Sequence, residues 1–314
     1  MKVAVVIPCR NVAALVPLAI ASARDQGIPD MEVIAVDDAS DDGTTEALEA
    51  CARDAGAPVR VITLGSRVGA SAARNAGMEA TDAEWVQFLD ADDALLPGKI
   101  RRQLAIAQSA NADVVAGGYI NRYEDERADE EVLPLAGDPW MALVRTRMGT
   151  TSANLFRREA VIGAGGWDKD LRSSQDYELL FRLLKHRSPV AWDPEPGCVV
   201  LKRGTGSISR TDEQANWLRY IDLRCAMRDH LHAMDPTRHA AAIAAADQYL
   251  FMAIRVLSAH DRNAAFAAFD RMIPKGFIPE PGRATSSTYI SFFNLLGFRW
   301  AERLAGGKDA VMGR

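Results

Sequence analysis

Short apolar runs alternate with helical patterns through the first third of this 314-residue chain. A short run without polar alternation is typical of a strand that is covered on both faces, as in a parallel sheet. The predicted strands cover residues 3–7, 32–36, 59–62, 85–89 and 113–116, and the predicted helices cover residues 12–23, 44–55, 70–80 and 99–109. We therefore expect an α/β fold, with a Rossmann-like, mostly parallel sheet flanked by helices.

The strand pattern becomes weaker after this region and then stops. We expect an acidic loop over 124–131, a helix over 138–148 and a strand over 152–156. An amphipathic helix over 177–185 and two short strands over 190–192 and 198–201 complete this part. Only helical patterns follow residue 212, to about 272 and again over 288–304. We place a domain boundary near Ser209, between residues 1–209 and a helical C-terminal extension, 210–314.

Composition excludes several classes of protein. The net charge is −5, so nothing indicates a nucleic-acid-binding protein. The four cysteines form no CxxC pair, which favours free thiols in a reducing compartment over a zinc site or disulfides. The first apolar run ends at Pro8 and Arg10, too early for a secretory signal, and no uninterrupted apolar stretch approaches the ~18 residues of a membrane span. We expect a cytoplasmic protein.

Polar clusters follow three of the predicted strands. They begin at Pro8, at Asp37 and at Asp90. In parallel sheets, ligands bind beyond the carboxyl ends of the strands. The three clusters are therefore expected to meet at one edge of the sheet.

The cluster Asp90, Asp92 and Asp93 carries three carboxylates within four residues. Such groups stay ionised at low cost only with a cation or several hydrogen-bond donors among them. Oxygen ligands suit Mn²⁺ or Mg²⁺, which are commonly shared with substrate phosphates. The alternative is an acidic turn in which Asp93 caps a helix that starts near Lys99. The residues alone leave both open.

Three other candidates have equally ordinary alternatives. Asp38 ends a strand, where it can accept a hydrogen bond from a base or a ribose, whereas Asp41 and Asp42 are expected to cap the next helix. Arg74 lies on a predicted helix and could bind a phosphate, or be a surface arginine. Asp176 falls in a first helical turn after Ser174, a plausible N-cap, and is either a favourable first-turn acid or a base.

These motifs, in this order, resemble family 2 of the inverting glycosyltransferases, which have the GT-A fold. The similar segments cover about two-thirds of the chain: Val5–Asn11, Val36–Ser40, Ser71–Gly77, Phe88–Asp93, Gly166–Asp168 and Gln175–Asp176. The resemblance implies roles for single residues. Nucleotide-sugar binding falls to Pro8, Arg10, Asp38, Arg74 and Asp90, metal binding to Asp92, and the role of catalytic base to Asp176.

The resemblance also implies a reaction. A divalent ion, Mn²⁺ or Mg²⁺, would sit on the diphosphate of a nucleotide-sugar donor, with a UDP-sugar as the first expectation. The acceptor would be a hydroxyl of a glycan or lipid-linked glycan, and the anomeric configuration would invert without a covalent enzyme intermediate. Residues 1–209 would then be the catalytic domain, and 210–314 would contact the acceptor, another subunit or a membrane. Polysaccharide or surface glycan synthesis is the implied setting.

The chain departs from the family pattern at two informative positions. Gln175 stands where the family usually has Glu, and Gly204 where a His often approaches the metal. Lys202 and Arg203 therefore become candidates for binding the diphosphate. Trp167 and Asp168 are candidates for the loop that meets the acceptor. We weigh two alternative functions: a nucleotidyltransferase on a related fold, which would need a Gly-rich phosphate loop after the first strand, and a catalytically inactive module that binds sugar nucleotides.

The C-terminal segment differs in charge from the rest. Residues 271–314 contain seven Lys or Arg and three Asp or Glu, a net charge of +4, around the aromatic stretch 289–300. A basic, aromatic, amphipathic stretch can lie in a membrane interface. We favour the alternative that its rings pack on the catalytic domain or on a second subunit, because apolar helix faces are usually core.

Overall fold

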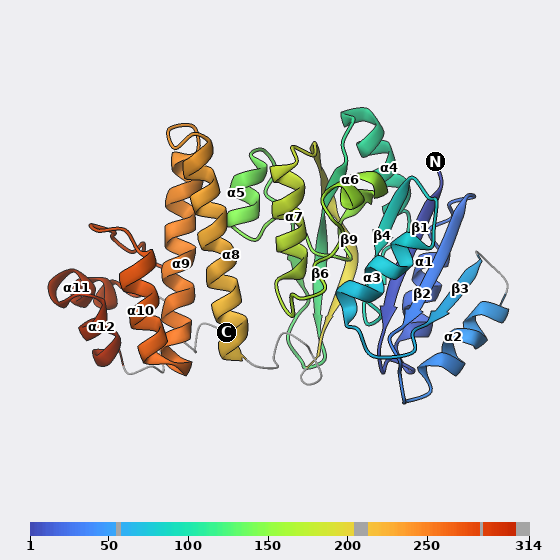
Figure 1. The fold of residues 1–314 in the computed structure, drawn as a ribbon, viewed down its shortest axis with the longest axis horizontal. Helices are drawn as coiled ribbons and strands as arrows, with labels where there is room; N and C mark the ends of the chain where they lie inside the picture. Colours follow the sequence, from blue (N-terminus) through green and yellow to red (C-terminus); the bar gives the residue numbers. More distant parts are fainter. Residues whose placement is uncertain (55–57, 204–212, 283–284, 306–314) are drawn as a thin grey trace. The chain divides into compact units, whose positions relative to one another are not determined.

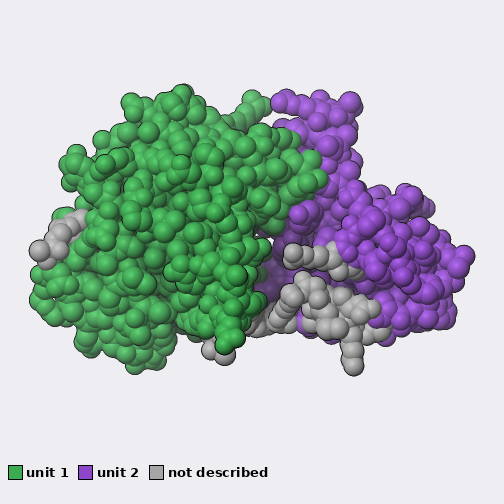
Figure 2. Space-filling model, turned by 180° about the vertical axis from the view of Figure 1, so that it is seen from behind, with its two compact units in different colours: residues 1–206 green, residues 207–314 purple. Residues whose placement is uncertain are grey.

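The computed structural model describes residues 1–54, 58–203, 213–282 and 285–305. The chain divides into two compact units, Met1–Gly206 and Ser207–Arg314, which are coloured separately in Figure 2. The boundary that we predicted near Ser209 lies outside the described residues, as does Gly204. Each unit is described by itself below.

Unit 1 alternates strands and helices, as Figure 1 shows. Its strands are β1 (Val3–Cys9), β2 (Met31–Asp37), β3 (Val59–Thr63), β4 (Trp85–Phe88), β5 (Ala94–Leu95), β6 (Val114–Tyr123), β7 (Glu130–Val132), β8 (Leu155–Arg157) and β9 (Val190–Lys202). Its helices are α1 (Val16–Arg24), α2 (Thr44–Arg53), α3 (Ala70–Glu79), α4 (Lys99–Ala110), α5 (Pro139–Val144), α6 (Arg158–Gly163) and α7 (Gln175–Lys185).

All the strands of unit 1 belong to one sheet, in the order β3-β2-β1-β4-β8-β6-β9-β5, with β7 paired to β6. Strands β3, β2, β1 and β4 are parallel neighbours, and β6 is parallel to β9. The pairings of β8, β5 and β7 are antiparallel. The expected α/β fold is confirmed. The sheet is mixed, because the strands after β4 form both parallel and antiparallel pairs.

Side chains that alternate along β1 pack into two separate apolar layers. Val3, Val5 and Ile7 face a core shared with α1, α2 and α4. Ala4 faces the other layer, where the alanines of α3 pack. Helix α3 comes so close that a Cβ on Gly77 would lie 2.4 Å from a methyl group of Val6. The small residues of α3 therefore let this helix carry its polar side chains close to the sheet.

Strand lengths differ from the prediction on the far side of the sheet. The two short strands expected at 190–192 and 198–201 form one strand, β9, whose register against β6 shifts around Gly118. Pro194 and Pro196 lie at this irregularity, because a proline has no N–H for the ladder. Because prolines usually interrupt strands, the sequence pattern predicted two short strands instead of one.

Unit 2 is helical in its described part, as predicted. Its helices are α8 (Glu213–Met234), α9 (Ala240–His260), α10 (Arg262–Met272), α11 (Ser287–Leu296) and α12 (Phe298–Leu304). The single helix expected over 288–304 is two, because Gly297 has a φ of 76°, which only glycine adopts at low cost. Among the described residues, α9 alone has the length and apolar composition of a membrane span; many of its residues are buried in the core of unit 2.

Candidate active site

The three polar clusters meet at one edge of the sheet, as expected. Cys9 at the end of β1 is level with Asp37 at the end of β2, and Phe88 at the end of β4 is level with Val6. The backbone N–H of Asp38 donates to the carbonyl of Cys9, at 2.8 Å. The parallel register therefore brings the start of each polar cluster to the same edge.

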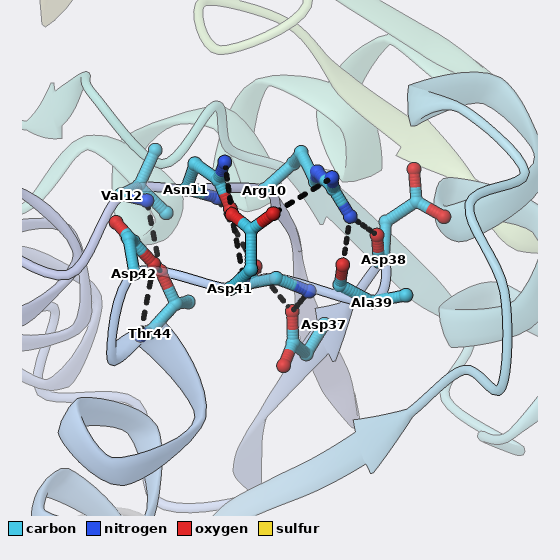
Figure 3. Close-up of polar contacts among 10 residues, drawn as sticks. Arg10, Asn11, Val12, Asp37, Asp38, Ala39, Asp41, Asp42 and Thr44 are labelled. Carbon is cyan, nitrogen blue, oxygen red and sulfur yellow. Dashed lines mark hydrogen bonds and ion pairs between the residues drawn. The ribbon is translucent and has the colours of Figure 1, made fainter.

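The guanidinium of Arg10 holds the first two clusters together (Figure 3). Its Nη1 donates to the backbone carbonyl of Asp38 at 2.8 Å, and also to that of Ala39. Asn11 and Asp41 exchange two hydrogen bonds across the same gap, at 2.7 and 3.1 Å. These contacts join the segments that follow β1 and β2, beside which the nucleotide base is expected.

The first acidic turn is satisfied by its own backbone and hydroxyl groups. Asp37 is fully buried and accepts from the N–H and hydroxyl of Ser40 and from the hydroxyl of Thr45. Asp42 accepts from the N–H of Thr44, the first residue of α2, at 3.0 Å. The N-cap position is Gly43 and not Asp41 or Asp42 as expected, although Asp42 satisfies the first N–H of the helix. Asp41 bonds to Asn11 instead.

The carboxylate of Asp38 points away from Arg10 (Figure 3) and is buried. It accepts from the backbone N–H of Val68 at 2.6 Å and of Gly69 at 2.9 Å, just before α3. Gly69 has a φ of 91°, a conformation that lets successive N–H groups turn toward one anion. Asp38 thus holds the loop that leads into α3.

Arg74 on α3 connects three parts of the chain. Its Nη2 forms an ion pair with Asp90 at 2.6 Å, and its Nη1 donates to the side-chain oxygen of Gln175 at 3.0 Å. The guanidinium carbon lies 4.6 Å from the centre of the Trp167 ring. The Arg74 side chain is 7% exposed, so it is no ordinary surface arginine. Four residues that the sequence singled out separately thus form one contact group.

Asp93 does not cap the helix that starts at Lys99, which was the ordinary alternative. Its two oxygens accept from the hydroxyl of Ser152 at 2.6 Å and from the backbone N–H of Leu201 at 3.1 Å. The Ser152 hydroxyl also accepts from the N–H of Asp90, at 3.1 Å. Burial, and then the charge of Asp90, raises the pKa of Asp93 well above its usual value. Asp93 therefore ties the acidic turn to the end of β9.

This tie brings Arg203 to Asp92, with an ion pair of 2.7 Å. Burial and the neighbouring charge of Asp90 raise the pKa of Asp92, whereas Arg203 lowers it. Further positive charge nearby would stabilise the ionised form of this carboxylate. The described residues contain no group of three or more His, Cys, Asp or Glu side chains suited to a metal. The arrangement fits Mn²⁺ or Mg²⁺ held by one or two carboxylates, with phosphate and water as the other ligands.

Asp176 lies in the first turn of α7, where it was expected. Ser174 occupies the N-cap position with a φ of 58°, but its side chain makes no capping hydrogen bond. The carboxylate of Asp176 accepts from the N–H of Tyr177, at 2.9 Å. Burial raises the pKa of Asp176, while this N–H and the charge of Arg74 lower it. A carboxyl with a raised pKa is a stronger base when ionised, as a proton acceptor requires.

The remaining candidates lie outside this contact group. Asp168 is exposed and accepts from the N–H of Asp170, and Lys202 is also exposed. Pro8 lies on β1, paired in register with Val36.

Two residues that contribute to the site were not singled out from the sequence. Ser152 lies between Asp90 and Asp93, and Tyr119 on β6 has its pKa raised to about 12 by burial and then by the charge of Asp176. A lone Ser and a lone Tyr on a strand carry no signal in the sequence.

Comparison with known proteins identifies the family of this chain. The family model described as glycosyl transferase family 2 matches residues 4–162. An uncharacterized glycosyltransferase of Haemophilus influenzae is 26% identical over 67% of this chain and 72% of its own length. The succinoglycan biosynthesis protein ExoO of Rhizobium meliloti is 31% identical over 65% of this chain and 62% of its own length.

Solved structures show the same fold. Residues 1–349 of TarS from S. aureus, solved with UDP-GlcNAc, have a TM-score of 0.60 and 14% identity, covering 85% of this chain and 88% of that one. The mannosyltransferase PcManGT of Pyrobaculum calidifontis, solved with GDP-Man and Mn²⁺, has a TM-score of 0.60 and 16% identity, covering 99% and 85%. The family match spans about half of the chain and includes β1, β2, α3 and the Asp90 turn. This chain belongs to glycosyltransferase family 2, has the GT-A fold and is a transferase.

Proposed function

We propose that the protein is a metal-dependent, inverting glycosyltransferase. It transfers a sugar from a nucleoside-diphosphate sugar, with a UDP-sugar as the first candidate, to a hydroxyl of a glycan or lipid-linked glycan. The contact group around Arg74 carries this proposal, because it joins the turn at Asp90 to the start of α7, next to Asp176. On this proposal, residues 74 and 90 would belong to the donor site, and residue 176 would be the proton acceptor beside it.

The donor would lie along the edge between β1, β2 and β4. Arg10 and the backbone around Pro8 would flank the base, and each oxygen of Asp38 retains a lone pair for a further donor. Asp90 would face the ribose. Arg74 would bind the nucleotide through its forked donors, one of which already faces Asp90.

Asp92 would hold the metal, and Arg203 would turn to the diphosphate once Asp92 has another cation beside it. When bound, the metal neutralises charge that develops on the departing diphosphate. Arg203 and Lys202 lie at the end of the same strand, β9, so they can supply further positive charge to that group. The bound nucleotide and metal would thus replace the ion pairs that Asp92 and Asp90 form with Arg203 and Arg74.

Asp176 would accept the proton of the acceptor hydroxyl, which attacks the anomeric carbon from the face opposite the diphosphate. One carboxylate base suffices for such a displacement, and no enzyme nucleophile is needed. Asp168, which is exposed in the loop before α7, would contact the acceptor. Trp167, for which the same role was expected, is only 2% exposed, so it would position this loop and not touch the acceptor itself. The Trp167 ring is fixed edge-on against Phe88, with centroids 5.1 Å apart.

The relatives support the donor class. TarS was solved with UDP-GlcNAc and with UDP, and PcManGT with GDP-Man and Mn²⁺. The names of ExoO and of the amylovoran biosynthesis glycosyltransferase AmsE refer to polysaccharide synthesis. We extend that setting to this protein. The four cysteines are free thiols in the structure, which fits the cytoplasm, where we place the reaction.

The test has two stages. Thermal unfolding is followed with a panel of UDP-, GDP- and dTDP-sugars, each with Mn²⁺ and with EDTA. The proposal expects one nucleotide class to raise the midpoint in Mn²⁺ and far less in EDTA. The preferred donor is then incubated with candidate acceptors, and the anomeric configuration of the product is read by NMR. Retention of configuration would contradict the assigned chemistry. Stabilisation by a donor that is never transferred or hydrolysed would favour a binding module.

A further inference from the structure

The hairpin of α11 and α12 exposes an unusual number of large apolar side chains. Helices α11 and α12 contact each other at the C-terminal end of unit 2 (Figure 1). Leu295 is 79% exposed and Trp300 55%. We call the following exposed side chains the outer face of the hairpin: Phe292, Leu295, Leu296, Trp300 and Leu304. The first three recur at helical spacing on α11, and the last two lie one turn apart on α12, so each set shares one side of its helix.

The opposite sides of α11 and α12 pack in the core of unit 2. Tyr289, Phe293 and Phe298 are buried, and all three rings pack around Phe251 of α9, at centroid distances of 5.4 to 6.3 Å. This apolar contact takes up the side of each helix that faces the core of unit 2. Each helix of the hairpin therefore has one buried side and one exposed apolar side.

A buried polar network fixes this orientation. Glu302 on α12 is 1% exposed and accepts from Arg255 of α9 and from the hydroxyl of Tyr289 on α11, both at 2.7 Å. The guanidinium of Arg255 also lies 3.6 Å from the centre of the Tyr289 ring. Rolling the hairpin to bury its outer face would pull this carboxylate away from its partners, which is costly in a buried site. The apolar side chains are therefore held outward.

Among the described residues of α11 and α12, the exposed charges are positive. Glu302 is the only acidic residue between Ser286 and Ala305, and its charge is internal. Arg299 and Arg303 are exposed, one helical turn apart on α12. Arg299 pairs with Asp270, whereas Arg303 lies against the Trp300 ring, its guanidinium carbon 4.8 Å from the ring centre. Trp and Arg side chains of this kind combine an apolar body with a polar end, which suits a membrane interface.

We propose that the outer face of the hairpin docks on an anionic membrane surface. Exposed apolar side chains with Arg303 beside them match the chemistry of such a surface, in which acyl chains lie beneath negative headgroups. A second copy of the chain is a poorer match, because Glu302, the only acidic residue of α11 and α12, is buried, so pairing this face with itself would offer Arg303 no carboxylate. The inference goes beyond the proposed reaction, since it concerns unit 2 and would hold for an inactive protein.

The test measures binding of the full chain to vesicles, without any enzymatic readout. Vesicles of phosphatidylcholine alone are compared with vesicles in which phosphatidylglycerol makes up roughly a third of the lipid, by flotation and at two salt concentrations. We expect binding to the anionic vesicles, weaker binding at high salt, and little binding to the neutral ones. Leu295→Ser with Trp300→Ser should weaken binding roughly tenfold or more, because both apolar side chains are lost from the interface. Arg303→Gln should weaken it roughly fivefold.

The matched control is Leu18→Ser, which removes a leucine that is 65% exposed on α1 of unit 1. Vesicle binding should not change, and circular dichroism should show that all variants remain folded. Two outcomes would overturn the inference: wild-type protein that fails to bind anionic vesicles, or binding that survives the double substitution. If size-exclusion chromatography shows a dimer that only the double substitution dissociates, and vesicles are not bound, the face is instead a contact between copies.

Discussion

The two acidic turns of unit 1 look alike in the sequence and differ in the structure. Both follow strands of the parallel part of the sheet, at residues 37–42 and 90–93. In the first turn, Asp37 and Asp38 accept from backbone N–H groups and from neighbouring hydroxyls. In the second turn, Asp90 and Asp92 face the guanidinium groups of Arg74 and Arg203.

The two turns differ in whether a ligand can replace the present partners of the carboxylates. A backbone N–H cannot leave a carboxylate without unfolding the loop that carries it, so the first turn is chiefly a structural unit. A guanidinium on a flexible side chain can move to a phosphate, and its carboxylate can then take a metal ion. Asp93, held by Ser152 and Leu201, behaves like the first turn although it lies in the second. The hydrogen-bond partners of these acids distinguish their roles, whereas their spacing in the sequence does not.

The largest effect is expected at Asp176, whose pKa is lowered by the charge of Arg74 and raised by burial. Asp176→Asn removes the proton acceptor, so transfer should fall roughly 10²–10⁴-fold while nucleotide affinity stays within a small factor. Initial rates and calorimetry with a donor nucleotide measure the two quantities. Asp170→Asn, an exposed neighbour, should change neither. A variant that transfers sugar at the wild-type rate would remove Asp176 from the mechanism.

Asp92→Ala should abolish the dependence of nucleotide binding on Mn²⁺. The carboxylate that would hold the metal is gone, and we expect affinity in Mn²⁺ to fall roughly 100-fold, toward its value in EDTA. Stability should not fall, because burial and Asp90 already disfavour the charge of Asp92. Asp41→Ala, in the first turn, is the matched change. Equal losses of affinity from both substitutions would contradict the distinction between the turns.

Asp37→Ala should destabilise the fold without acting on the chemistry. The side chain is fully buried and accepts three hydrogen bonds, from Ser40 and Thr45, whose donors would be left without a partner. We expect a loss of about 2–3 kcal/mol in the free energy of unfolding, measured in urea. The folded fraction should keep its affinity for the nucleotide. Unchanged stability would mean that these hydrogen bonds contribute little.

The smallest effect is expected from Gln175→Glu, which places a charge beside Asp176. A neighbouring negative charge raises the pKa of Asp176 further above its usual value. The base must be ionised to act, so activity is lost as pH falls through this pKa. The acid limb of the pH–rate profile should therefore move to higher pH, by roughly one unit or less. Pairing of the introduced carboxylate with Arg74 would act in the same direction, because it would weaken the positive charge that lowers the pKa of Asp176. A shift of the acid limb to lower pH would therefore contradict the assignment of this limb to Asp176.

The sequence predicted the fold of unit 1 well wherever elements were long and uninterrupted. Local interruptions caused two of the errors: Pro194 and Pro196 divided the pattern of β9, and in unit 2 Gly297 divided a helix that the apolar pattern suggested was one. The short strands β5 and β7 were not predicted, and β7 begins inside the expected acidic loop over 124–131. The acids at the strand ends could be placed at one edge because parallel strands point the same way. Their partners could not be named, because Arg74, Ser152 and Arg203 arrive from distant segments whose approach depends on packing.

The sequence by itself determined the class of this protein: alternating strands and helices, carboxylates at strand ends, and the ordered motifs of family 2. These features are local, since periodicity and turn chemistry act over a few residues. Only the tertiary structure decided which acids face exchangeable arginines, which are held by the backbone, and which face of the C-terminal hairpin remains exposed. Such properties depend on contacts between segments that lie dozens of residues apart, and no local pattern encodes the distance between them.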